Sequence, residues 1–149
     1  MSDVVVVDAS LALKWVLPED DSDIANMLLK QWTIDGKDVI APALFTYETT
    51  NILYRQIVTG RLTYEETKQA QTKLFSIGVS LVFSQYQNMS KRAMEFAHRF
   101  TLLAAYDAHY LALAERENCE YWTADTRLLN ALNGKLPWVR KLNDYQALR

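Results

Sequence analysis

The 149-residue chain is poor in cysteine, glycine and proline, with one, four and three of them respectively. Its single cysteine, Cys119, excludes an internal disulfide and suits the reducing cytoplasm, where we expect the protein to work. So few glycines and prolines leave no linker or low-complexity segment, and no internal repeat is visible. We therefore expect a single domain over residues 1–149.

Long apolar runs and an excess of one charge are also missing. No apolar stretch approaches the ~20 residues of a membrane helix, and Asp3 and Asp8 interrupt the region where a signal peptide would be basic and then uncharged. We expect neither membrane contact nor secretion. Sixteen basic against eighteen acidic residues give a net charge of −2, so any contact with a nucleic acid must be local. A hydrophobic content of 50% excludes disorder.

The most informative stretch is a run of four valines, residues 4–7, that ends in Asp8. A near-continuous apolar run indicates a strand covered on both faces, as in the centre of a parallel sheet. Asp8 then stands at the carboxyl end of that strand. In open α/β sheets this edge is where helix N-termini gather and where ligands bind.

Helical and strand patterns alternate along the rest of the chain. Helices are expected over residues 9–17, 22–32, 44–58, 63–76, 88–100, 106–114 and 125–132, and strands over 38–42, 79–83, 120–123 and 138–142. This alternation predicts right-handed crossovers and an α/β fold with a mainly parallel sheet.

Several apolar and aromatic positions are expected to form the core. Leu44, Tyr47 and Tyr54 follow one stripe of the 44–58 helix, and Trp15 and Trp32 lie on earlier helices. We expect these side chains to be mainly buried, with some left over for a dimer or partner surface.

Four acids, Asp8, Glu48, Asp107 and Asp125, are candidates for one site. Asp8 and Asp125 each end a strand, so both stand at the carboxyl edge. Asp107 reaches this edge if its helix starts there, and Glu48 reaches it if its helix leans over the edge. Each acid also has a plainer explanation, because the aspartates could be helix caps and Glu48 a solvated surface residue.

Carboxylates gathered in this way need a counter-charge. Within about 6 Å they raise one another's pKa unless a divalent cation neutralises them. Oxygen ligands with no cysteine or histidine at coordinating spacing favour Mg²⁺ or Mn²⁺, and such a site suits phosphodiester hydrolysis. The hydroxyls of Ser10 and Thr123, each two positions from an aspartate of the set, could support the ligands or bind phosphate, and Asn51 could hold Glu48 or a metal-bound water.

Four motifs in order resemble the PIN domain, and in particular the VapC toxins of bacterial and archaeal toxin–antitoxin pairs. They are VVVVDAS at residues 4–10, Glu48-x-x-Asn51, YDAHYLALA at residues 106–114, and WTAD at residues 122–125 followed by Leu128-Leu129. The resemblance spans nearly the whole chain. It implies a three-layer α/β/α sandwich, a Mg²⁺- or Mn²⁺-dependent endoribonuclease, a homodimer, and inhibition by a cognate antitoxin protein.

Carried over by position, the resemblance makes Asp8 and Asp107 metal ligands. Glu48 and Asp125 complete the acidic quartet, and Ser10, Asn51 and Thr123 support it. The chain departs from the pattern at residues 120–122, Glu-Tyr-Trp, which are bulkier and more polar than the aliphatic strand usual at that place.

Two other functions stay open. One is a PIN-fold RNA- or protein-binding module without turnover, which the presence of all four acids disfavours. The other is a phosphotransferase of haloacid-dehalogenase or receiver type, which also uses an aspartate after its first strand. That chemistry needs an acid two residues on, or adjacent acids with a late lysine, and Ser10 occupies the first of these positions.

Local contact with an RNA backbone would fall to basic residues on the helices. The candidates are Lys14, Lys91, Arg92, Arg99 and Arg127. Each has an equally simple explanation as a hydrated or ion-paired surface charge.

Overall fold

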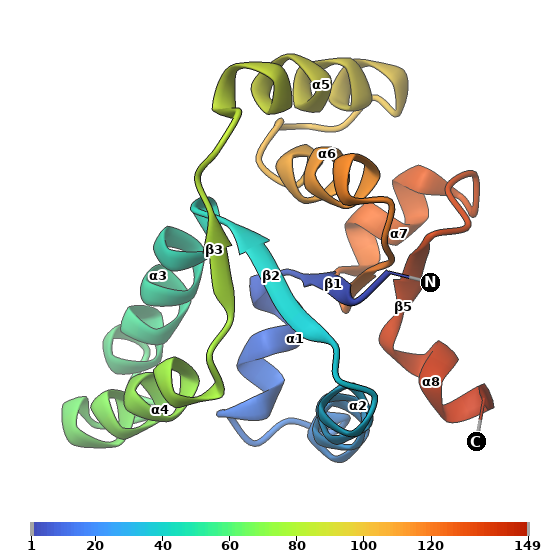
Figure 1. Ribbon diagram of the computed structural model, residues 1–149. Coiled ribbons are helices and arrows are strands. Elements are labelled where there is room, and N and C mark those ends of the chain that lie inside the picture. The colour runs from blue at the N-terminus through green and yellow to red at the C-terminus, as the bar shows by residue number, and fades with distance from the viewer. Residues whose placement is uncertain (1, 149) are drawn as a thin grey trace.

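The computed structural model describes residues 2–148, whose strands form one parallel five-stranded sheet in the order β3-β2-β1-β4-β5 (Figure 1). The strands are β1 (Val4–Val7), β2 (Asp38–Pro42), β3 (Ser80–Val82), β4 (Tyr121–Thr123) and β5 (Val139–Lys141). All five were expected from the sequence.

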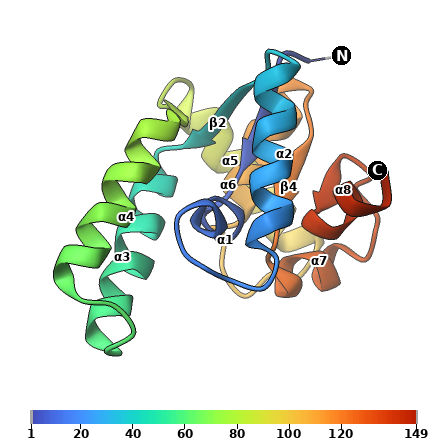
Figure 2. The same cartoon turned by 90° about the horizontal axis from the view of Figure 1, so that it is seen from below.

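Helices cover both faces of the sheet. They are α1 (Ala9–Ala12), the 3₁₀ turn η1 (Leu13–Trp15), α2 (Ser22–Ile34), α3 (Leu44–Val58), α4 (Tyr64–Ile77), α5 (Tyr86–Arg99), α6 (Ala108–Glu117), α7 (Thr126–Leu132) and α8 (Leu142–Leu148). In Figure 1, α5 and α6 lie above the sheet and α1 and α2 below it, and Figure 2 shows α1 and α2 in front with α5 and α6 behind. The predicted three-layer α/β/α arrangement is confirmed.

The valine run forms the centre of the sheet, as predicted. β1 lies between β2 and β4, with Val6 in register with Ile40 on one side and Tyr121 on the other. Val5, Val6 and Val7 are buried. Because Asp8 follows directly, its carboxylate stands in the middle of the carboxyl edge.

The first helix is shorter than the sequence pattern suggested. Residues 9–17 were expected to be helical, but the α-helix ends at Ala12 and tightens into the 3₁₀ turn of η1. The amide of Leu17 still donates to the Leu13 carbonyl oxygen (2.8 Å). Pro18 provides no amide hydrogen and disfavours helical geometry at Leu17. The helix therefore narrows to a 3₁₀ turn and ends.

The buried side of α3 was predicted with the wrong rotational phase. Tyr47 and Tyr54 are 72% and 60% exposed, whereas Phe45, Thr49 and Leu53 are buried. Thr49 can occupy the core because its hydroxyl donates to the Phe45 carbonyl oxygen (2.8 Å) within the same helix. The aromatic stripe therefore faces outward. Trp15 and Trp32, in contrast, are buried as expected, and Leu44 is partly buried against the core.

Local sequence signals correctly predicted where α4 begins and ends. α4 begins with a capping box in which the Thr63 hydroxyl accepts from the Glu66 amide and the Glu66 carboxylate accepts from the Thr63 amide. It ends at Gly78, whose φ of 83° is left-handed.

One helix, α8, was not expected from the sequence, and it follows β5 without a break. Within residues 2–148, no helix has both the length and the apolar character required to cross a membrane.

Candidate active site at the carboxyl edge of the sheet

Asp8 is the most completely hydrogen-bonded acid of the site. Its Oδ1 accepts from the Ser10 hydroxyl (2.6 Å) and the Leu11 amide (3.2 Å). Its Oδ2 accepts from the Tyr121 hydroxyl (2.5 Å) and from the Thr123 hydroxyl. The Leu11 bond is the helix cap that the plainer explanation required, and the three hydroxyl bonds go beyond capping.

These bonds oppose the effect of burial. Asp8 is only 5% exposed, and burial raises the pKa of its carboxyl while the four donated hydrogen bonds lower it. Ser10 and Thr123 are therefore partners of Asp8, as the sequence suggested. The Ser10 oxygen also accepts from the Ala124 amide (3.1 Å), which links α1 to the residue after β4.

Asp107 is not explained by helix capping. It occupies the N-cap position of α6, but its carboxylate makes no cap bond. The residue is half-buried, and its carboxylate has no hydrogen bond or ion pair to any residue in the range 2–148. Burial, followed by the charges of Asp125 and Asp8, raises the pKa of Asp107 to about 6. A charged carboxylate in this position lowers stability, and no hydrogen bond or ion pair from the described residues offsets that cost.

Glu48 is also not the solvated residue of the plainer explanation. It is half-buried on α3, and its Oε1 accepts from the Tyr110 hydroxyl on α6 (2.5 Å). Burial raises the pKa of Glu48, and the charges of Asp107, Asp8 and Asp125 add to that rise. The helix thus leans over the edge as expected.

Asn51 does not join this cluster through Glu48. It lies three residues further along α3, is exposed, and has no hydrogen bond to the Glu48 carboxylate, whose hydroxyl partner is Tyr110. The suggestion that Asn51 holds Glu48 is therefore wrong. A role for Asn51 toward a metal-bound water stays a prediction.

Asp125 caps α7. Its Oδ1 accepts from the amides of Arg127 (3.0 Å) and Leu128 (3.3 Å), as expected for an N-cap. Its own amide donates to the Thr123 hydroxyl oxygen (3.0 Å), so Asp125 is tied to the same hydroxyl that binds Asp8. Its Oδ2 accepts no hydrogen bond from residues 2–148. Capping and a site role are therefore compatible in this residue.

The four carboxylates interact electrostatically without forming a closed cage. Asp8, Asp107 and Asp125 all raise the pKa of Glu48, and Asp8 and Asp125 raise that of Asp107. Within residues 2–148, no three carboxylate, imidazole or thiol side chains already stand at metal-coordinating distances. The cluster nevertheless offers only carboxylate oxygens, and their negative charges repel one another. Hard divalent cations prefer oxygen ligands of this kind.

Two tyrosines at the base of the site were missed by the sequence analysis. Tyr121 and Tyr110 each donate a hydroxyl hydrogen to one acid, Asp8 and Glu48 respectively. Tyr121 could have been found from the strand period of two, which places it on the same face of β4 as Thr123. Tyr110 follows Asp107 by three residues and so shares its side of α6.

The basic residues proposed for RNA contact differ in whether their charges are already paired. Lys14 binds Asp21 (2.7 Å) and Glu19 (3.3 Å), and Arg92 binds Glu115 (2.6 Å), so their charges are already paired. Arg127 is exposed beside Asp125 and has no ion pair with any residue of the described range. It is the better placed of these three for contact with a phosphate.

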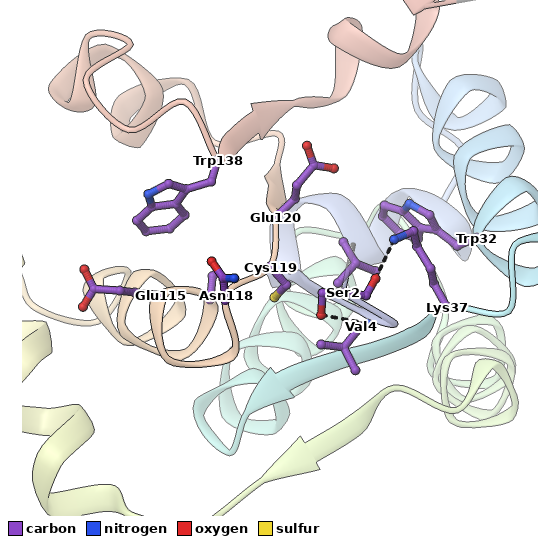
Figure 3. Close-up of a pocket in the computed structure, with 11 residues that line it drawn as sticks. Ser2, Val4, Trp32, Lys37, Glu115, Asn118, Cys119, Glu120 and Trp138 are labelled. Atoms are coloured by element: carbon purple, nitrogen blue, oxygen red, sulfur yellow. Dashed lines mark hydrogen bonds between the residues drawn. The ribbon is translucent and has the colours of Figure 1, made fainter.

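Two hollows lie at opposite edges of the sheet. One, of about 460 Å³, adjoins Ser10 and Ala124 and runs between η1 and α3 to Arg61. The other, of about 360 Å³, lies where β1 and β4 begin, and Figure 3 shows Lys37 there, donating to the Ser2 carbonyl oxygen (2.8 Å). Of the two, only the first is lined by Ser10, a hydrogen-bond partner of Asp8.

The fold and the acids define the class as a parallel α/β protein with an acidic centre at the carboxyl edge. The PIN domain family matches the chain over residues 5–133. The chain belongs to the PIN domain family, which confirms the resemblance drawn from its motifs.

Named relatives agree with this assignment. The chain is 28% identical to Ribonuclease VapC3 of Pyrobaculum aerophilum over 124 residues, which cover 83% of this chain and 91% of that protein. The solved structure of PAE2754 from Pyrobaculum aerophilum has a TM-score of 0.68 at 20% identity, covering 96% of this chain and 89% of that one. That of Mycobacterium tuberculosis VapC20, a sarcin–ricin loop cleaving toxin, has a TM-score of 0.64 at 17% identity, covering 91% and 98%.

Proposed function

We propose that this protein is a metal-dependent endoribonuclease and the toxin of a toxin–antitoxin pair. The observation that carries the proposal is Asp107, a half-buried carboxylate with no partner in the described chain and a pKa raised to about 6 beside Asp8 and Asp125. The names of the relatives support ribonuclease activity. The acidic quartet supports Mg²⁺ or Mn²⁺ as the cofactor.

The oxygen donors present are of the kind that such a cation prefers. Asp107 has both oxygens free of donors from residues 2–148, and Glu48 and Asp125 each have one. These three carboxylates would hold the cation, while Asp8 contributes its charge, and its role as a direct ligand stays a prediction. When bound, the cation lowers the pKa of a water and stabilises charge on the phosphate oxygens. The chain's own part is to fix the carboxylates at one edge and to keep their helices in place.

The proposed partners are structured RNA, a cognate antitoxin and a second copy of the chain. Arg127 and Arg61 are exposed, lack ion pairs within the described residues, and lie at Asp125 and in the hollow beside Ser10 respectively. They would meet the RNA backbone locally despite the net charge of −2. The apolar walls of the same hollow suit an antitoxin segment that blocks the site.

The test is cleavage of a structured RNA by purified protein. Cleavage is expected with Mg²⁺ or Mn²⁺ and should stop on addition of EDTA. Asp107→Asn should lower the rate by more than the roughly 10- to 100-fold that loss of an outer partner of a metal ligand costs. Because this change also removes repulsion among the acids, the melting temperature should be equal or higher. Gel electrophoresis of end-labelled RNA and calorimetry measure the two effects.

Asp38→Asn is the matched control. Asp38 is exposed at the start of β2, on the opposite edge of the sheet, so this variant should cleave at the wild-type rate. Equal cleavage by wild type and Asp107→Asn would contradict the assignment of the site. Metal-independent RNA binding without any cleavage would instead support a binding module.

A further inference from the structure

Beneath the four acids lies a pair of buried tyrosine rings, Tyr110 on α6 and Tyr121 on β4. Their centroids are 5.7 Å apart and their planes differ by 17°, so the rings are stacked. Both side chains are fully buried, with 0% exposure. Stacked and enclosed rings of this kind cannot change rotamer without displacing their neighbours.

Each ring points its hydroxyl at a different carboxylate. The Tyr121 hydroxyl donates to Asp8 Oδ2 and the Tyr110 hydroxyl donates to Glu48 Oε1, and both donor–acceptor distances are 2.5 Å. Asp8 directly follows β1 in the sheet, whereas Glu48 lies on α3 in a helical layer. The stacked pair therefore links two acids that lie far apart in the sequence and in different layers of the molecule.

The two hydroxyls are not needed for the packing of the rings. A phenylalanine at either position would keep the stack and its apolar contacts and would remove only the donated hydrogen bond. A hydroxyl buried without a partner would be costly, so each tyrosine depends on its carboxylate as well. What the hydroxyls add is a fixed orientation of the two acids.

We infer that Tyr110 and Tyr121 are positioning residues that hold Glu48 and Asp8 ready for a divalent cation. The inference rests on the proposed function, since it assumes that the acids bind such an ion. The rings touch neither the substrate nor the cation, and they act through the acids. Without the Tyr110 hydroxyl, Glu48 loses the partner on α6 that orients it. Without the Tyr121 hydroxyl, Asp8 keeps its bonds from Ser10, Leu11 and Thr123 but is held less firmly. In either variant, part of the binding energy of the cation is spent on ordering the acid.

The test measures Mn²⁺ affinity by isothermal titration calorimetry, in the absence of RNA. Tyr121→Phe and Tyr110→Phe should each raise the Kd by roughly 10-fold, the lower end of the loss seen when a partner of a metal ligand is removed. Tyr64→Phe is the matched control, because it deletes an exposed hydroxyl on α4 and should leave the Kd unchanged. Melting temperatures are recorded for all variants, and titrations are run well below them.

The outcomes separate the inference from the function on which it rests. If the wild type binds Mn²⁺ and both phenylalanine variants bind it equally well or more tightly, the rings serve packing alone and the inference is overturned. If the wild type binds no Mn²⁺, the metal site itself fails and the inference falls with it. Should Tyr121→Phe not fold, Tyr110→Phe decides the question, because its hydroxyl reaches Glu48 from α6.

Discussion

At the scale of single residues, the site is built from carboxylates that the fold stabilises unequally. Asp8 accepts four hydrogen bonds, whereas Asp107 accepts none from the described residues. Burial raises the pKa of Asp8 despite these bonds, and it raises the pKa of Asp107 with no such bonds to oppose it. Asp107 is therefore the acid of the site whose burial is offset by no hydrogen bond from the described residues.

The raised pKa of Asp107 predicts that stability in metal-free buffer depends on pH. Asp107 has a pKa of about 6 in the folded state, above its ordinary value of 3.8. The folded state thus binds its proton more tightly, so this residue's contribution to stability falls as the pH rises from about 4 through 6. Calorimetry between pH 4.5 and pH 7.5 should show a steeper fall in melting temperature for wild type than for Asp107→Asn. Identical slopes for the two proteins would contradict the prediction.

At the scale of elements, α6 connects the site to the outer layer. It begins beside Asp107, carries Tyr110, and packs under α5. Arg92 on α5 binds Glu115 on α6 through two parallel contacts, Nε to Oε1 (2.6 Å) and Nη2 to Oε2 (2.9 Å). A two-point contact of this kind fixes the relative position of the two helices. Arg92 is thereby a clamp between helices and is not free for RNA.

The clamp can be tested with a conservative change. Arg92→Lys keeps the positive charge but cannot make the two-point contact, so the free energy of unfolding should fall by about 0.5 kcal/mol. RNA cleavage and its KM should stay as in wild type at temperatures well below melting. Chemical denaturation and steady-state kinetics measure the two quantities. A raised KM at unchanged stability would assign Arg92 to RNA binding instead.

At the scale of the whole molecule, we place the interface of the proposed homodimer on the outward aromatic face of α3. Tyr47, Tyr54 and Val58 are 60–72% exposed along one side of the helix. Tyrosine is enriched at interfaces, and apolar side chains gathered on a surface commonly mark contact with another protein. The proposed homodimer would cover them.

Light scattering coupled to size exclusion tests this proposal. The wild type should elute as a dimer and Tyr54→Glu as a monomer, since a charge would then be buried without a partner. Ile34→Glu on α2 is the control, because Ile34 is exposed to a similar extent but lies on a different face. A monomeric wild type, or a dimeric Tyr54→Glu variant, would contradict the assignment of the interface to α3.

Much of the architecture could be read from the sequence, for physical reasons that differ by element. The valine run before Asp8 predicted a central strand because only a strand covered on both faces tolerates it. Thr63 and Glu66 predicted the start of α4 because a capping box is a local signal. The rotational phase of α3 could not be predicted, because Thr49 hides its hydroxyl in its own helix and so behaves as a core residue.

The candidate site was only partly predictable. Strand ends indicated where Asp8 and Asp125 would stand, and both lie at the carboxyl edge. The hydrogen bond from Tyr121 to Asp8 was not predicted, because core packing alone accounts for a bulky residue in a buried strand. This bond depends on the pairing of β1 with β4, a long-range contact that no local pattern encodes.

The central claim is that Glu48, Asp107 and Asp125 hold one divalent cation beside the charge of Asp8. The most direct measurement is the anomalous difference density of a crystal soaked in Mn²⁺. We expect a peak at the carboxyl edge, within coordination distance of Asp107 and at least one other acid of the four, and no peak there in Asp107→Asn crystals. Density at a different place, or none beside these carboxylates at saturating Mn²⁺, would contradict the claim.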